Sequence, residues 1–550
     1  MGISESMATM KHAIFAINFR SAPTTRRWAD LVQIRIGTPL NGPMKGRFWP
    51  ALAIALLAGC TSLAPPYQQP ALPVAEQYPY ATSTTPATLQ GPGTQPGDAA
   101  ELRLSDYFSA PELRAWIALA LQNNRDLRLA AWRVQEARAA HGIQRSAQYP
   151  TLGAGAEGVR ARTPGDLNPS GAALTASQYQ VGAGINGWEL DFFGRLQNLN
   201  QAALQEFLAT DAARRALHLS LIAQVAQRYL AIQELDERIL LAQRAEHSQR
   251  ESLRIFTRRM EVGVASRLEV TQVQSLLAQA EALALQLQQT RALEAHALAL
   301  LVGTPVEVPS LYVAGREMGP VAAPIAELDP GLPAALLYNR PDIVAAEHRL
   351  RGANANIGAA RAAFFPRITL TAFGGSASAE LDGLFGSGSR AWRFAPSLEL
   401  PLFDAGRRQA NLDLAQARRH IAVAQYEQTI QRAFREVADA LASQTFLQRQ
   451  LQVQERALSA QAERVRLATL SYDNGATTFL EVLDAQRSLL SAEQQLVQAR
   501  AALQAARVAL YSALGGGSAR IEAAAQPGAI GNDGQPFSAS ATPPTPQPQR

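Results

Sequence analysis

The chain has 550 residues, with 51 Lys and Arg against 46 Asp and Glu and a formal net charge of +5. Residues 1–59 hold seven of the basic and two of the acidic residues, so 44 of each remain from residue 60 onward and that part is formally neutral. Composition therefore gives no support for a nucleic-acid partner, which needs a basic surface. The only cysteine is Cys60, which excludes an intrachain disulfide.

Residues 44–60 have the layout of a secretory signal peptide. A short basic stretch opens at Met44, an apolar run covers 51–57, and Leu57-Ala-Gly-Cys60 follows. The apolar run is far shorter than the ~20 residues that span a bilayer. Leu57-Ala-Gly-Cys60 resembles the bacterial lipobox, in which the cysteine is acylated and becomes the new N-terminus. Thr61 follows rather than Asp, which in Gram-negative lipoproteins implies sorting to the outer membrane.

The next segments are a tether and a first helix. Residues 60–100 are rich in Pro, Gly, Thr and Gln. They predict a lipidated, extended tether that is mostly unstructured unless it lies against the body. A helical pattern then runs from about Pro111 to Tyr149, with Trp132 among its apolar positions, and Pro150 ends it.

The rest of the chain contains one helical hairpin twice. Residues 195–262 form a run of 68 residues without Gly or Pro, Gly263 interrupts it, and 39 more such residues lead to Gly303. The same counts recur, offset by 212, in residues 407–474, at Gly475, and in the run that ends before Gly515. A helix of 68 residues would be roughly 100 Å long. This tandem repeat predicts two long hairpins with a narrow apolar stripe, typical of helices packed as in a coiled coil.

Each copy also contains two segments with strand periodicity. They are expected to begin at Leu152 and span 179–190 in the first copy, and to span 367–375 and 392–400 in the second, where a helix at 342–363 precedes them. Four strands cannot close a barrel, for which about eight are needed, and an open edge in lipid leaves backbone groups unpaired. Either several chains pool their strands in a membrane, or the strands form a small soluble sheet on the helices.

These patterns divide the chain into six parts. We expect a leader (1–59), a lipidated tether (60–100), a first repeat of helix, two strands and long hairpin (101–303), a linker (304–333), a second repeat (334–517) and a low-complexity disordered tail (518–550).

The order of elements resembles the outer-membrane efflux protein family, the TolC-like channels, and most closely their lipidated OprM/NodT-type branch. The resemblance covers roughly residues 60–517. Beside the lipobox and the doubled plan, it is carried by Leu190-Asp-Phe-Phe-Gly-Arg195, Leu400-Pro-Leu-Phe-Asp-Ala-Gly-Arg407 and Tyr472-Asp-Asn-Gly-Ala-Thr-Thr-Phe-Leu-Glu-Val-Leu-Asp-Ala-Gln-Arg487. The first two are similar to the family's strand-to-helix turns and the third to its hairpin tip.

The resemblance implies a mainly α fold with a β-barrel part. In this TolC-like fold, long α-helical hairpins form one barrel, and each chain has two structural repeats and contributes four transmembrane strands. It implies a homotrimer whose twelve strands form one barrel in the outer membrane of a Gram-negative bacterium. The helices would form a tunnel through the periplasm. The implied function is a passive exit duct for drugs or other small molecules. The implied partners are outer-membrane lipid, a periplasmic adaptor (membrane fusion) protein and an inner-membrane pump of the RND type.

Candidate functional residues concentrate where each hairpin reverses. Only the second copy has an acid–base pair just beyond the turn, because Asp484 and Arg487 correspond to Gln272 and Ser275 under the 212 offset. In the family that the chain resembles, residues at the positions of Leu480, Asp484 and Arg487 close the periplasmic entrance, so we expect three such sets to form a resting gate. The alternative is an exposed ion pair within one helix, worth well under ~1 kcal/mol.

The residues at the two turns are the expected contacts for the adaptor. Glycine is suited to a turn that ends a helix because it adopts positive φ without strain. The expected adaptor-contact residues are Val262, Gly263, Val264 and Leu268 in the first tip and Asn474, Gly475 and Ala476 in the second.

Enzymatic chemistry has no support in the sequence. The seven histidines are scattered, no His-Glu-x-x-His motif or cysteine pair is present, and no nucleophile lies in a recognisable elbow. We therefore expect no catalytic residue, no metal and no cofactor except the lipid on Cys60. The alternative to a duct is a lipid-anchored periplasmic coiled-coil scaffold with a soluble β cap and no transport.

The leader generates a first prediction. Residues 1–43 would extend the charged n-region far beyond ordinary signal peptides, so we expect the precursor to begin at Met44 and the mature protein at an acylated Cys60. Mass spectrometry of N-terminal peptides from both forms checks this. Precursor peptides from residues 1–43, or a mature form that retains an unmodified Cys60, would contradict it.

Overall fold

The computed structural model describes residues 62–80, 103–305, 307–309, 325, 328 and 333–518. The predictions about the leader, Cys60 and residues 519–550 of the tail lie outside these ranges. The helices are α2 (Leu104–Tyr107), α3 (Pro111–Asn123), α4 (Arg125–Ser146), α5 (Arg195–Glu261), α6 (Arg267–Val302), α7 (Leu336–Asn339), α8 (Pro341–Ala362), α9 (Arg407–Asp473) and α10 (Phe479–Ala513). The strands are β1 (Leu152–Thr163), β2 (Leu174–Leu190), β3 (Arg367–Ser378) and β4 (Arg390–Glu399), and two 3₁₀ turns are η2 (Gly165–Leu167) and η3 (Pro333–Ala335).

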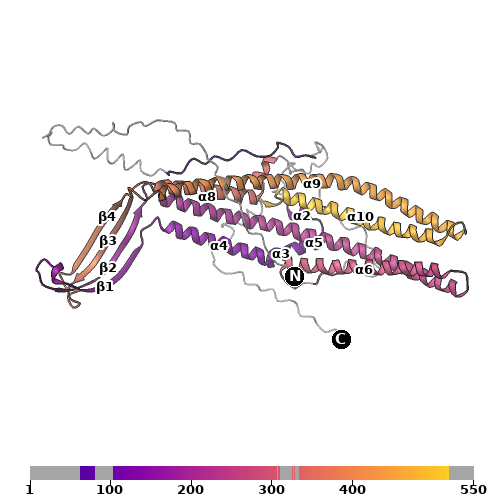
Figure 1. The fold of residues 1–550 in the computed structure, drawn as a ribbon, viewed down its shortest axis with the longest axis horizontal. Helices are drawn as coiled ribbons and strands as arrows, with labels where there is room; N and C mark the ends of the chain where they lie inside the picture. Colours follow the sequence, from indigo (N-terminus) through magenta and orange to yellow (C-terminus); the bar gives the residue numbers. More distant parts are fainter. Residues whose placement is uncertain are drawn as a thin grey trace, which may run out of the picture. The chain divides into compact units, whose positions relative to one another are not determined.

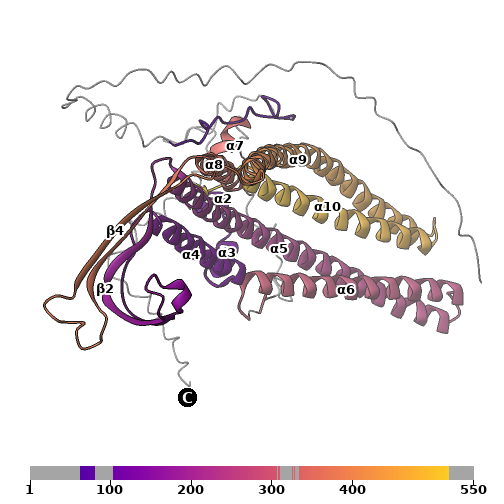
Figure 2. The ribbon, with the colours of Figure 1, turned by 60° about the vertical axis from the view of Figure 1, so that its left-hand side comes forward.

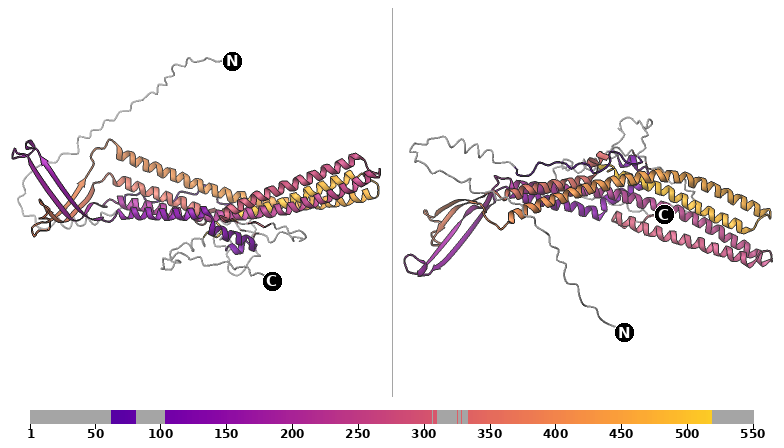
Figure 3. Two further views of the ribbon diagram at one scale, coloured as in Figure 1. Left: turned by 90° about the horizontal axis from the view of Figure 1, so that it is seen from below. Right: turned by 45° about the horizontal axis from the view of Figure 1, so that its top comes forward.

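Two helices of 67 residues, α5 and α9, organise the packing. Next to the strands, α5 lies against α4 and α8, and α8 also packs on α9. Beyond the middle, α6 pairs with α5, α10 pairs with α9, and α5 contacts α10 (Figure 1, Figure 2). Each long helix is therefore covered by one set of shorter helices in its first half and by another in its second half. Both hairpin tips lie at the same end of the helices (Figure 3).

The predicted duplication is present in the structure. The helices α5 and α9 start at residues 195 and 407 and end at 261 and 473, which preserves the offset of 212 at both ends. The prediction of one helix over 111–149 was wrong, because α3 and α4 are separate. Asn124 divides them: its side-chain oxygen accepts from the Leu127 N–H at 2.8 Å, which caps α4. Its amide also donates to the Leu301 carbonyl at the end of α6 at 2.8 Å.

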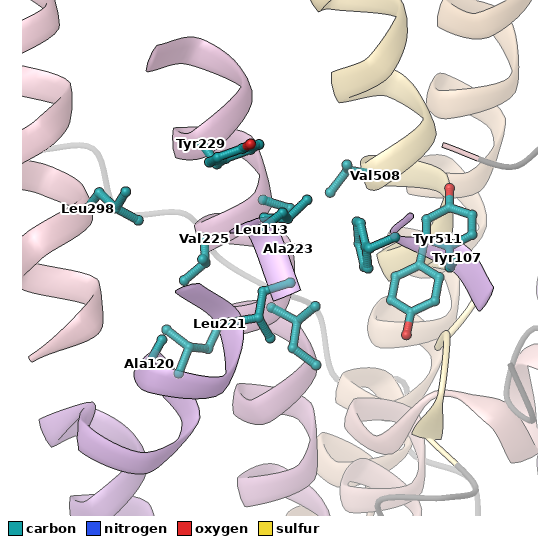
Figure 4. Packing of buried hydrophobic residues seen from close by; sticks show 14 of the residues in the cluster. Tyr107, Leu113, Ala120, Leu221, Ala223, Val225, Tyr229, Leu298, Val508 and Tyr511 are labelled. Carbon is teal, nitrogen blue, oxygen red and sulfur yellow. The ribbon is translucent and has the colours of Figure 1, made fainter. Parts of the chain in front are cut away.

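The largest buried cluster lies where α2, α3, α5, α6 and α10 meet (Figure 4). Val225 and Tyr229 of α5 are buried here with Leu298 of α6 and Val508 of α10. The ring of Tyr107 in α2 stacks on Tyr511 in α10 with centroids 4.5 Å apart. The Tyr107 hydroxyl donates to the Arg507 carbonyl at 2.8 Å. This core joins the two repeats.

The four strands form one antiparallel sheet in the order β1-β2-β3-β4. Residues opposite each other in the register share a face, and the two faces differ. On the apolar face, one row of residues paired across β1 to β4 is Leu152, Ile185, Ala372 and Phe394. The next row is Ala154, Ala183, Gly374 and Trp392. Rows on the opposite face are Gly153, Gly184, Phe373 and Arg393, and Glu157, Gln180 and Ala377. Close to the helices the sheet thus has one apolar face and one polar, glycine-rich face, whereas farther along the strands Arg160, Arg162 and Arg390 lie on the apolar side.

The sheet has two free edges in the described part of the chain, because β1 and β4 each pair on one side only. An unpaired edge is a template for another strand.

None of the helices in the described ranges has a stretch long and apolar enough to cross a membrane.

Residues 62–80 of the expected tether lie against the body rather than apart from it. Ser62 donates to the Asn198 side chain near the start of α5 at 2.8 Å. The remaining contacts are with α8 and α9: Tyr67 with Glu347 at 3.0 Å, Gln69 with Tyr426 at 3.1 Å, and the stacked rings of Tyr78 and Phe434 at 5.1 Å. The segment therefore binds mainly to the second repeat.

The buried ion pair of the first hairpin generates a stability prediction. Arg291 of α6 donates to Asp236 of α5 at 2.6 Å, and the Asp236 side chain is 1% exposed. Removing one partner of a buried pair costs about 3–5 kcal/mol because the other charge stays buried. We expect Arg291→Met to lower the free energy of unfolding by about 3 kcal/mol, measured by denaturant unfolding followed by circular dichroism.

Arg254→Met is the matched control, because Arg254 pairs with Glu251 on the surface of α5 with both side chains largely exposed. We expect it to change the free energy of unfolding by no more than about 0.5 kcal/mol. Equal effects of the two substitutions would contradict the prediction.

Candidate functional site at the hairpin tips

Both hairpins reverse through the same backbone motif. Gly263 and Gly475 have φ of 81° and 73°. The N–H of Val264 donates to the Arg259 carbonyl, five residues back, and that of Ala476 donates to the Ser471 carbonyl, each at 2.9 Å. This is the Schellman arrangement, which satisfies the last carbonyls of a helix and places glycine in the left-handed region. The repeat therefore determines the local geometry of both tips.

The two helices that follow the turns begin differently. At α6, Ser266 and Glu269 form a complete capping box, in which the Glu269 N–H donates to Ser266 Oγ at 3.2 Å and the Ser266 N–H donates to Glu269 at 2.7 Å. The hydrogen bonds from Ser266 hold the pKa of Glu269 below its ordinary value. At α10, the corresponding residues are Thr478 and Glu481, but the Thr478 side chain makes no capping hydrogen bond. The start of α10 is therefore held by fewer hydrogen bonds.

An aromatic cluster joins the first tip to the second. Phe256 of α5 is 3% exposed and lies against Phe479 of α10 with ring centroids 4.4 Å apart. Tyr472 of α9 also contacts Phe479, with ring centroids 5.0 Å apart. Arg259 of α5 lies over the Phe256 ring and donates to the Tyr472 hydroxyl. Val273 and Leu483 complete this buried cluster.

The expected gate residues lie at the start of α10. Arg487 donates to Asp484 Oδ1 at 2.6 Å within the chain, as the i, i+3 spacing predicts. A second arginine, Arg464 of α9, donates to Asp484 Oδ2 at 2.7 Å and to Ser488 Oγ at 3.3 Å. The hydrogen bond from Arg464, together with the charges of both arginines, holds the pKa of Asp484 below its ordinary value. Leu480 lies one turn before Asp484 and is 54% exposed.

Sequence reasoning missed Arg464. The signal for it was the position of the turn: Arg464 lies eleven residues before Gly475 and Asp484 nine residues after it, and antiparallel helices bring such positions side by side. The aromatic cluster was also missed, because it joins residues of two different hairpins.

The first tip presents exposed apolar side chains. Val262, Val264 and Leu268 are more than half exposed. In the second tip, Asn474 donates from its side chain to the Leu470 carbonyl at 2.7 Å, which completes the end of α9. The described residues contain no group of three or more His, Cys, Asp or Glu side chains that could hold a metal ion.

The family model of outer membrane efflux proteins matches residues 116–304 and 332–516. The chain therefore belongs to the outer membrane efflux protein family. The two matched segments contain the two long hairpins.

Two relatives are similar to this chain over nearly their whole length. The solvent efflux pump outer membrane protein SrpC of Pseudomonas putida is 43% identical over 479 residues, which cover 86% of this chain and 99% of the relative. The outer membrane protein OprJ of Pseudomonas aeruginosa is 41% identical over 472 residues, or 85% of this chain and 95% of the relative.

Solved structures show the same fold. A membrane protein from Pseudomonas aeruginosa is 40% identical and superposes with a TM-score of 0.75, covering 83% of this chain and all of that chain. The open state of the Neisseria gonorrhoeae MtrE outer membrane channel is 37% identical and superposes with a TM-score of 0.73. The match covers 84% of this chain and 99% of that chain. These findings confirm the predicted family, the mainly helical TolC-like fold with a small antiparallel sheet, the outer-membrane location and the role as an outer-membrane efflux channel protein.

The aromatic cluster generates a prediction for the tips. Truncating a buried Phe costs about 3–5 kcal/mol, and Phe256 joins the first hairpin to the second through Phe479. We expect Phe256→Ala to speed backbone hydrogen exchange in both tips by about tenfold or more, measured by mass spectrometry. Ile255→Ala is the control, because the neighbouring Ile255 is 47% exposed. Faster exchange in the first tip alone would show that the cluster does not join the hairpins.

Proposed function

We propose that three copies of this chain form a passive exit duct, in which the sheets pool into one outer-membrane barrel and the helices enclose a tunnel through the periplasm. The observation that carries the proposal is the sheet: in the half close to the helices it has one apolar and one polar face, and in the described part of the chain it has two unpaired edges. In lipid, every backbone group must be paired. Four strands are too few to close a barrel, so the edges β1 and β4 would pair between copies.

The helices support the same assembly. The helix α4 has no buried residue within one chain, and its Trp132 is 68% exposed. Leu129 and Ile143 of α4 are also at least half exposed, and a surface with several large apolar side chains is typical of an interface with another protein. Two helices of about 100 Å suit a conduit through the periplasm.

The periplasmic entrance would be closed at rest by the second tip. In the proposed gate, Leu480, Asp484 and Arg487 of three copies meet at the axis, where the leucines form an apolar ring and the charged side chains pair within or between copies. The support is that the pair is formed in the chain and that Leu480 and Arg487 remain largely exposed. Both are available to a neighbouring copy.

The proposed partners are a periplasmic adaptor and an inner-membrane pump of the RND type. The exposed apolar residues of the first tip, Val262, Val264 and Leu268, with Gly263, and the turn residues Asn474, Gly475 and Ala476 of the second tip would contact the adaptor. Relatives are named for the efflux of solvents, toluene and antibiotics. We infer small apolar or amphiphilic substrates, with selectivity determined mainly by the pump.

A lipid on Cys60 would anchor the chain where the strands meet the helices. Ser62, two residues further on, is hydrogen-bonded to Asn198 in the first turn of α5. Two residues span at most about 7 Å. The acyl chains would therefore enter the membrane beside the barrel.

Ion conductance in a planar bilayer tests the duct and its gate together. We expect small or flickering steps from the wild type and clearly larger, several-fold higher steps from Asp484→Ala/Arg487→Ala, because the substitutions remove the charged pair that closes the entrance. Trimers that resist SDS until heated provide the folding control for both proteins.

The other outcomes separate the parts of the proposal. Steps that the double substitution leaves unchanged would keep the duct and reject the gate. No conductance from well-folded trimers of either form would reject the duct and favour a lipid-anchored scaffold.

A further inference from the structure

The carboxylate of Asp484 is held from two sides by arginines of different helices. Arg487, three residues further along α10, donates a hydrogen bond to Oδ1. Arg464, across the hairpin on α9, donates one to Oδ2. Arg464 also reaches Ser488 Oγ at 3.3 Å, while that hydroxyl donates to the Asp484 carbonyl at 2.9 Å. One guanidinium thus binds two neighbouring positions of α10, which a planar fork of donors can do.

The first hairpin has no counterpart of this clamp. Under the offset of 212, Arg464 corresponds to Ser252, Asp484 to Gln272, and Ser488 to Leu276. Ser252 donates only to the Ser248 carbonyl of its own helix. The first hairpin folds in the same way without a clamp at these positions, and Arg250 of α5 instead pairs with Glu281 of α6 at 3.1 Å.

The three side chains differ in their exposure to solvent. Arg487 is the most exposed at 66%, whereas Arg464 and Asp484 are 42% and 38% exposed. The bond from Arg487 connects neighbouring turns of one helix and moves with α10. The bond from Arg464 connects α10 to α9 and so fixes where the carboxylate points relative to the hairpin.

We propose that Arg464 is the positioning residue of the gate: it holds the Asp484 carboxylate against α9, which leaves the Arg487 guanidinium directed outward to the neighbouring copy. The inference rests on the proposed gate at Asp484 and Arg487. Without Arg464, one oxygen of Asp484 loses its partner. The carboxylate then rotates with Arg487 instead of holding it in one direction, and the closed entrance loses its fixed arrangement of charges.

Single-channel recording of Arg464→Ala in planar bilayers tests the inference. We expect the ratio of open to closed time to rise about 2- to 5-fold per chain, the range that one exposed ion pair can supply. Arg464→Lys should restore closing in part, because a lysine keeps the charge but cannot bind Asp484 and Ser488 with one planar group. In an Asp484→Ala background, Arg464→Ala should add nothing, since Arg464 acts through that carboxylate.

Arg466→Ala is the matched control, because Arg466 lies two residues further along α9 and pairs at 2.8 Å with Glu463 of the same helix. It should leave the open time unchanged. If Asp484→Ala opens the channel and Arg464→Ala does not, the positioning role is wrong and the gate stands. If neither opens it, the gate itself is wrong. If Arg464→Ala has its full effect in the Asp484→Ala background, Arg464 acts by another route and the inference is overturned.

Discussion

The two 67-residue helices impose the main constraint on this structure, because a helix of that length with a narrow apolar stripe needs a partner along its whole length. No single helix covers either of them. Next to the sheet, α5 packs against α4 and α8, and beyond the middle it packs against α6 and α10. The change of partners falls at the buried cluster around Tyr107, Tyr229 and Tyr511. The same helix therefore joins the first repeat to the second in both halves, through α8 and then through α10.

The duplication preserves contacts that shape the scaffold and changes those that act at the tip. Asn124 precedes α4 and Arg340 precedes α8. Each donates to a carbonyl near the end of the second helix of a hairpin, Asn124 to that of Leu301 in α6 at 2.8 Å and Arg340 to that of Ala513 in α10 at 3.0 Å. Different side chains thus perform one task at equivalent places. The clamp on Asp484 belongs to the second copy alone. The two repeats share the same arrangement of helices. They differ at the tips, where the proposed gate lies.

The sequence predicted what depends on local periodicity and failed where remote segments meet. Counting residues between Gly263 and Gly303 and between Gly475 and Gly515 predicted both hairpins, since a glycine with positive φ ends a helix whatever surrounds it. The Asp484–Arg487 pair was predictable because its partners are one turn apart. Arg464 was not predicted, because its contact depends on how α9 and α10 are aligned. The docking of residues 62–80 was also beyond prediction, since a segment without periodicity carries no signal for the helices that it contacts.

The interface between α5 and α10 is polar in the middle and apolar at its ends, which bears on how the tips can separate. Arg238 donates to the Gln494 side chain at 2.5 Å and Gln494 returns a bond to the Arg238 carbonyl at 3.0 Å, while Gln249 donates to Gln486 at 3.2 Å. A hydrogen bond between neutral groups contributes about 1 kcal/mol, because water can replace either partner, and one from a charged donor such as Arg238 contributes about 1.5–3 kcal/mol. Burying an aromatic ring such as Phe256 contributes a similar amount, about 1.5–3 kcal/mol, because its separation exposes apolar surface. Separating α10 from α5 at the tips therefore requires both that the contact between Phe256 and Phe479 is exposed to water and that these polar groups exchange their bonds for bonds to water.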